Sequence, residues 1–68
     1  MSVSYKKLWK LIIDKDLKKS DVRKLANVSA STFSKMSKNE YVALEVIERI
    51  CNVLECDIGD VVEVVKEK

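Results

Sequence analysis

Residues 19–36 read KSDVRKLANVSASTFSKM, a stretch that predicts two short helices joined by a tight turn. Asn27 stands at the turn, because asparagine enters the left-handed backbone region more readily than most residues. Ser20 is the expected N-cap of the first helix, which runs to Ala26, and Ser29 is the expected N-cap of the second. The rest of the chain is interpreted around this unit.

Each of the two helices has an inward and an outward side. In the first, the expected inward residues are Val22, Leu25 and Ala26. In the second, over about residues 29–37, Phe33 and Met36 fall three apart on the inward side. Its outward side is small, hydroxylated and basic, and carries Ala30, Ser31, Ser34 and Lys35. Such a face suits close approach to base edges and phosphates in a DNA major groove.

Apolar periodicity predicts two further helices. One spans about residues 4–15 and has an apolar face made of Tyr5, Leu8, Trp9 and Ile12, widened by Leu11 and Ile13. The other spans about residues 43–55 and turns inward Leu44, Ile47, Ile50, Cys51 and Leu54. Asp16 is expected to close the first of these helices, and Asp57 to open a short capped turn over residues 57–60.

A β-strand is expected at residues 61–65, because the run VVEVV is β-branched and has no helix cap. Residues 2–4, SVS, are its candidate partner within the chain. Strand alternation would turn Val62 and Val64 toward the core and Val61, Glu63 and Val65 away from it. The predicted fold class is therefore all-α, with four to five short helices and a short terminal β element.

The chain is short and its composition is typical of a helical domain. It has 68 residues, of which 47% are hydrophobic and 35% charged, with one glycine and no proline. These values predict one domain over residues 1–68, without a second, effector-binding domain. No apolar run approaches the roughly 18 residues of a membrane span, and the first residues lack a signal-peptide pattern, so we expect a cytoplasmic protein.

Charge is distributed unevenly along the chain. Residues 1–38 hold ten basic and three acidic side chains, whereas residues 39–68 hold three basic and eight acidic ones. The net charge of +2 therefore separates into +7 for the first part and −5 for the second. Because the positive part coincides with the two-helix unit, a polyanion partner explains both the sign and the location of the charge.

With these features the stretch resembles the helix-turn-helix of the Cro and phage-repressor family, also called Xre-like regulators. The resemblance reaches about Asp60. Within the motif it covers the polar start at Lys19 and Ser20, the first core residue Val22, the turn Asn27, Val28 and Ser29, and the inward residues Phe33 and Met36. After the motif it covers the helix from Leu44 to Leu54 and the ending CDIGDV at residues 56–61. Three positions differ from the family's usual pattern. They are Arg23 in place of alanine, Asn27 in place of glycine, and Ala43 in place of a serine or threonine cap, for which Asn39 is the nearest substitute.

The resemblance implies a lambda-repressor-like fold and a sequence-specific DNA-binding transcriptional regulator, in the first place a repressor of its own or a neighbouring operon. Its docking mode implies base contacts by the second motif helix, through Ala30, Ser31, Thr32, Ser34 and Lys35. It also implies contacts to the DNA backbone from both ends of the motif, through Lys18, Lys19, Ser20, Lys38 and Asn39.

Regulators of this kind usually bind a palindromic operator as symmetric dimers, because one recognition helix covers only a few base pairs. The expected homodimer contact is the terminal strand, through Val61, Val62, Glu63, Val64 and Val65. Two such strands can pair antiparallel across a two-fold axis. Pairing with residues 2–4 of the same chain is compatible with this, because a strand has two edges.

Several kinds of chemistry are missing from the sequence. It has no histidine and no glycine-rich phosphate loop, and its two cysteines, Cys51 and Cys56, are five residues apart. A zinc site or a Ser-His or Cys-His catalytic arrangement therefore cannot be assembled. We expect neither enzymatic activity nor a metal or cofactor, with Cys51 in the core and Cys56 at least partly buried.

Two other functions stay open. The domain could be an antitoxin-like or anti-regulator module that mainly contacts a protein, through the acidic fourth helix and the valine strand. It could also be a nonspecific nucleic-acid binder, because Ala30, Ser31 and Ser34 offer few bidentate contacts to bases.

Overall fold

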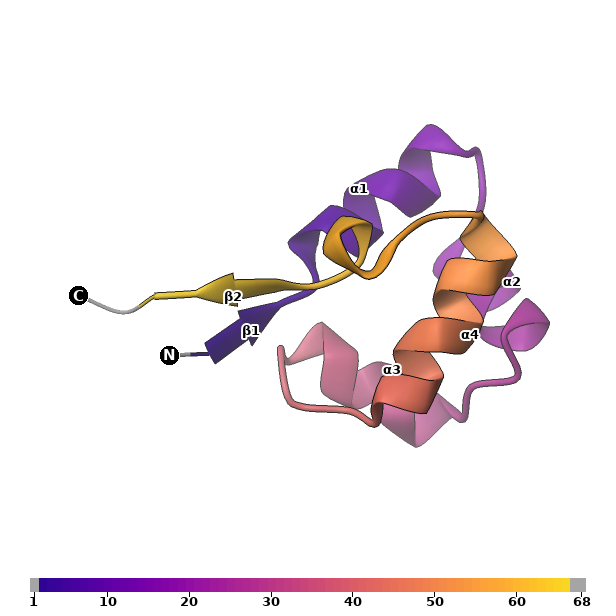
Figure 1. Cartoon of the computed structure of the whole chain (residues 1–68). Coiled ribbons are helices and arrows are strands. Elements are labelled where there is room, and N and C mark those ends of the chain that lie inside the picture. Colours follow the sequence, from indigo (N-terminus) through magenta and orange to yellow (C-terminus); the bar gives the residue numbers. More distant parts are fainter. Residues whose placement is uncertain (1, 67–68) are drawn as a thin grey trace.

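Helices account for most of residues 2–66, the part of the chain that the computed structural model describes (Figure 1). In chain order the elements are β1 (Ser2–Ser4), α1 (Lys6–Asp14), α2 (Lys19–Leu25), α3 (Ala30–Ser37), α4 (Leu44–Leu54), the 3-10 turn η1 (Ile58–Asp60) and β2 (Glu63–Val65). Helix α4 packs on α2, the first helix of the motif, and η1 brings the chain back against α1. The prediction of four short helices, a capped turn and a small β element is confirmed.

Each of the four helices is followed by a residue in the left-handed backbone region. These residues are Asp16, Asn27, Asn39 and Glu55, with φ between 52° and 57°. The predictions for Asp16 and Asn27 are confirmed, since both reverse the chain where glycine is the commoner choice.

The helix starts follow the predictions in part. Ser29 is the N-cap of α3, and its Oγ accepts a hydrogen bond from the Thr32 N–H at 3.2 Å. The prediction for Ser20 is wrong, because α2 already begins at Lys19 and the N-cap position belongs to Lys18. There the Asp21 carboxylate reaches back and accepts the Lys18 N–H at 3.0 Å, so a carboxylate in the first turn does the work expected of the serine.

The core draws on every helix, and its fully buried members are Tyr5, Leu8, Ile12, Val22, Met36, Ile50, Leu54 and Val61. Three residues of the predicted apolar faces are instead on the surface, Leu25 at 65% exposed, Leu44 at 68% and Ile13 at 71%. In the seven-residue α2, Val22 and Ala26 lie one turn apart under the neighbouring helices, while Leu25 falls on the uncovered flank. Leu44 is the first residue of α4 and lies beyond the edge of the core.

The two strands pair antiparallel, with Ser2 opposite Val65, Val3 opposite Val64 and Ser4 opposite Glu63. Pairing within the chain is thus confirmed, but the predicted alternation is wrong. Val61 is fully buried, and Val64 is 66% exposed. The reason is that Val61 still belongs to the end of η1, whereas Val64 lies in a ribbon that projects beyond the helices (Figure 1).

The two cysteines are free thiols, and both are half-buried against the core. The prediction for Cys56 is confirmed, whereas Cys51 was expected in the core and lies at its edge. The Cys56 N–H donates to the Cys51 carbonyl at 3.1 Å, which closes the end of α4. Burial raises the pKa of both thiols, that of Cys56 to about 11, so both stay protonated at neutral pH. Within residues 2–66 no helix is long and apolar enough to cross a membrane.

Candidate nucleic-acid interface

The turn between α2 and α3 is held in place from both sides. Val28 is buried in the core directly after the left-handed Asn27. On the outer side, the Arg49 guanidinium of α4 donates to the Asn27 carbonyl at 3.0 Å and pairs with Glu45 one turn earlier. The angle between α2 and α3 is therefore fixed by packing below the turn and by a hydrogen bond from α4 above it.

The outward side of α3 is open to solvent, as its sequence predicts. Phe33 and Met36 are buried beneath it, and the exposed residues are Ala30, Ser31, Ser34 and Lys35. Thr32 differs from the other candidates for base contact because it is half-buried. Its hydroxyl accepts a hydrogen bond from Ser29 at 2.9 Å and its N–H donates to the same side chain. Thr32 thus stabilises the N-terminal cap of α3 and also forms part of its outward side.

The candidates for backbone contact lie at the two ends of the motif and all are exposed: Lys18, Lys19, Ser20, Lys38 and Asn39. Lys19 is also held in place, since its Nζ lies 4.3 Å from the centre of the Trp9 ring. Trp9 in turn packs edge-on against Phe33, with the ring centres 5.5 Å apart. The prediction that Trp9 belongs to the apolar face of its helix is confirmed in part, because the ring packs against the core but one of its faces is covered by the Lys19 side chain.

Asn39 has a role that its sequence position did not reveal. It was the suggested cap of α4, but that N-cap is Ala43, which makes no side-chain cap bond. The Asn39 Oδ1 instead accepts the Tyr5 N–H at 3.2 Å. Because this bond uses only the oxygen, the NH2 group of the Asn39 side-chain amide stays available to donate to an anion.

Tyr41 is a surface residue that the sequence interpretation missed. Its ring is strongly exposed and shares a shallow hollow with Thr32 and Lys35, beside the outward side of α3. A phenol there can donate a hydrogen bond to a phosphate. In the sequence it is recognisable as a tyrosine that belongs to none of the predicted apolar helix faces and lies in the short segment between two helices.

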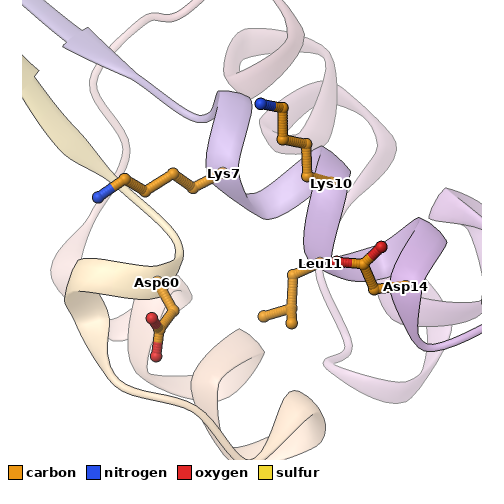
Figure 2. A pocket seen from close by; sticks show the side chains of 5 residues that line it. All are labelled: Lys7, Lys10, Leu11, Asp14 and Asp60. Carbon is orange, nitrogen blue, oxygen red and sulfur yellow. The ribbon is translucent and has the colours of Figure 1, made fainter.

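A second hollow, of about 270 Å³, lies between α1 and η1 (Figure 2). It is lined by Lys7, Lys10, Leu11, Asp14 and Asp60. Its two lysines and two aspartates balance in charge, and Lys7 Nζ donates to the Gly59 carbonyl at 3.5 Å. The hollow is therefore a junction between α1 and η1, and none of the predicted contact residues lines it.

Comparison with known proteins points the same way as the geometry. The Cro/C1-type HTH DNA-binding domain model matches residues 7–67 of the chain. The crystal structure of the transcriptional regulator VanUg superposes with a TM-score of 0.93 at 53% sequence identity, and the match covers 97% of this chain and 88% of that one. No curated protein matches the sequence.

Proposed function

The chain belongs to the Cro/C1-type helix-turn-helix DNA-binding domains, and from this we propose that it is a sequence-specific transcriptional regulator that reads the DNA major groove with α3. The observation that carries the proposal is the arrangement of α3 itself. Its small, hydroxylated outward side is exposed, and exposed lysines flank it at both ends of the motif. Small side chains let a helix approach base edges closely, and flanking lysines can fix its register on the phosphates.

In this proposal the base contacts are made by Ala30, Ser31, Thr32, Ser34 and Lys35, and the backbone contacts by Lys18, Lys19, Ser20, Lys38 and Asn39. Residues 1–68 act as one domain, and binding near a promoter blocks transcription of its own or a neighbouring operon. In this proposal α3 is the element that selects the DNA site. Repression by occupancy is the simplest mode of action for such a domain, because it needs no further surface.

Selection from a pool of random DNA duplexes tests sequence specificity directly. We expect a strongly enriched motif with two-fold symmetry. Equal affinity for all duplexes would replace the proposal with nonspecific nucleic-acid binding, and the small outward side of α3 makes this the second candidate. A complete lack of binding would favour a module that contacts a protein.

We further propose that two copies pair through β2 to bind a palindromic operator. In the described residues one edge of β2 pairs with β1 and the other edge has no partner strand. Val64 and Val65 of this strand are exposed. Unpaired strand edges with apolar side chains favour addition of another strand. In this proposal the contact runs from Val61 to Val65. Val61 is buried in the core and fixes this segment to its own domain.

Sedimentation with and without a palindromic duplex tests the dimer. Val64→Asp is expected to weaken self-association and binding to the palindrome, while binding to a half-site is retained. Ile13→Asp is the matched control, because Ile13 is equally exposed but lies on α1. A wild-type protein that stays monomeric at all concentrations, and binds the palindrome as two independent copies, would refute pairing through β2.

A further inference from the structure

Tyr5 lies between β1 and α1, and its backbone N–H and its side-chain hydroxyl both bind the segment that follows α3. The residue is only 2% exposed. Its N–H donates to the Asn39 Oδ1 at 3.2 Å, and its hydroxyl donates to the Glu40 carbonyl at 2.8 Å. One residue near the start of the molecule thus binds two consecutive residues 34 and 35 positions further along the chain, the first through its backbone and the second through its side chain.

Tyr5 is a rigid anchor for this purpose. Its ring is part of the core, and its carbonyl accepts the Trp9 N–H at 3.2 Å as the first bond of α1. Burial also raises the pKa of the phenol, so the hydroxyl keeps the proton that it donates. The anchor is therefore fixed by the core and by α1.

The segment that Tyr5 holds has only short-range ties of its own. The Asn39 N–H donates to Met36 and the Glu40 N–H donates to Lys35, at 3.0 and 2.9 Å. Asn39 itself is in the left-handed region, which asparagine enters more readily than most residues but which still costs free energy relative to the right-handed helical region. Without the two bonds from Tyr5, this exposed pair of residues would open more easily, because the core contacts of Met36 and Val42 lie on either side of it.

We propose that Tyr5 is a positioning residue for DNA binding, which fixes the direction of Lys38 by holding Asn39 and Glu40 against the core. This inference rests on the proposed function, in which Lys38 contacts the DNA backbone. Lys38 lies directly before the two residues that Tyr5 binds, so its side chain leaves the backbone from a point that the clamp determines. A lysine whose backbone is already fixed in the free protein loses less conformational entropy when it binds a phosphate.

Amide hydrogen exchange of the free protein tests the clamp without DNA. Tyr5→Phe keeps the ring and removes only the hydroxyl bond to Glu40. We expect exchange at the Glu40 N–H to become roughly twofold to tenfold faster, the range set by one hydrogen bond. The Val28 N–H, bonded to the Arg23 carbonyl at 3.0 Å, reports on the other end of the motif and should exchange as before. Equal acceleration at both amides would mean that the hydroxyl supports the fold in general, and would overturn the proposal.

A double-mutant cycle in DNA affinity tests the positioning role. Tyr5→Phe should raise the dissociation constant roughly twofold to tenfold, and Lys38→Ala should then weaken binding less in the Tyr5→Phe background than in the wild type. Lys19→Ala is the matched control, because Lys19 is held by Trp9 and its effect should be the same in both backgrounds. Additive effects of Tyr5→Phe and Lys38→Ala would refute the positioning role even though the wild-type protein binds DNA.

A second variant covers the case in which Tyr5→Phe fails to fold. Asn39→Gly preserves the left-handed backbone and removes the acceptor of the Tyr5 N–H. We expect it too to accelerate exchange at the Glu40 N–H, and unchanged exchange there would count against the clamp. If the wild-type protein binds no duplex at all, the proposed function fails, whereas the exchange experiment still decides whether the clamp exists.

Discussion

Two serines near the starts of the motif helices provide a sensitive test of the structure. Ser29 caps α3, and its hydroxyl both accepts the Thr32 N–H and donates to the Thr32 hydroxyl. Ser20 lies inside the first turn of α2, where Asp21 already accepts the Lys18 N–H. The sequence alone gives both serines the same role, so replacing each with alanine separates the structure from the pattern.

The expected effects on stability have different magnitudes and signs. Loss of an N-cap serine costs about 1 kcal/mol of unfolding free energy, so Ser29→Ala should lower the melting temperature by about 4 to 8 °C in a domain of this size. Ser20→Ala should be neutral or should stabilise by a few tenths of a kcal/mol, because alanine is the better helix former and no cap is lost. The Ser29→Ala change should also loosen the first turn of α3, which carries Ala30 and Ser31.

Thermal and urea unfolding followed by circular dichroism measure both variants. The urea slope should stay the same, so that the shifts in midpoint report stability. Equal losses in the two variants, or a larger loss for Ser20→Ala, would show that the start of α2 is assigned wrongly and would refute the reasoning.

Four further outcomes are expected. Leu54→Ala should destabilise the fold by about 2 to 5 kcal/mol in urea unfolding, while Leu44→Ala should stay within about 0.5 kcal/mol, because only Leu54 is buried. Lys35→Ala should weaken binding to the selected site by about 1 to 3 kcal/mol and blur one base position, whereas an equal loss on all sequences would make Lys35 a phosphate contact. The logarithm of DNA affinity should fall steeply with the logarithm of salt concentration, and Lys18→Ala should make that slope shallower by about 0.9; a flat salt dependence would contradict the backbone contacts. The pKa of the Cys56 thiol is raised from 9.0 to about 11, so its protonated form favours the folded state. This contribution to stability is fully present below pH 9 and is lost as the pH rises to about 11. The melting temperature should therefore fall over this range, and it should fall less in Cys56→Ser.

Local chemistry made much of the fold predictable. Asp16 and Asn27 stand where a helix must reverse, and Ser29 and Asp57 have oxygens within reach of the N–H groups of a following turn. Each of these predictions needs only neighbouring residues. The outward side of α3 was predictable for the same reason, because Phe33 and Met36 define its buried side.

Features that depend on distant segments were not predictable in this way. Periodicity shows which side of a helix is apolar, but not how wide an arc its neighbours cover, and Leu25 and Leu44 lie outside that arc. Alternation along β2 depends on the residue at which the strand begins, and η1 extends far enough to take Val61. The bonds from Tyr5 to the segment after α3 cross 34 and 35 residues of sequence, and no local pattern marks them.

The left-handed residues after the four helices also bear on how the protein can evolve. Asp16, Asn27 and Glu55 hold this conformation without glycine, so an exchange to glycine at any of them relieves backbone strain of up to about 1 kcal/mol. Asn39 is different, because its side chain binds Tyr5. Most changes on the surface of α3 that would retarget it to another DNA sequence are expected to lower stability slightly. Compensating exchanges at the helix ends lie away from that surface, so binding preference and thermal robustness can be altered independently of each other.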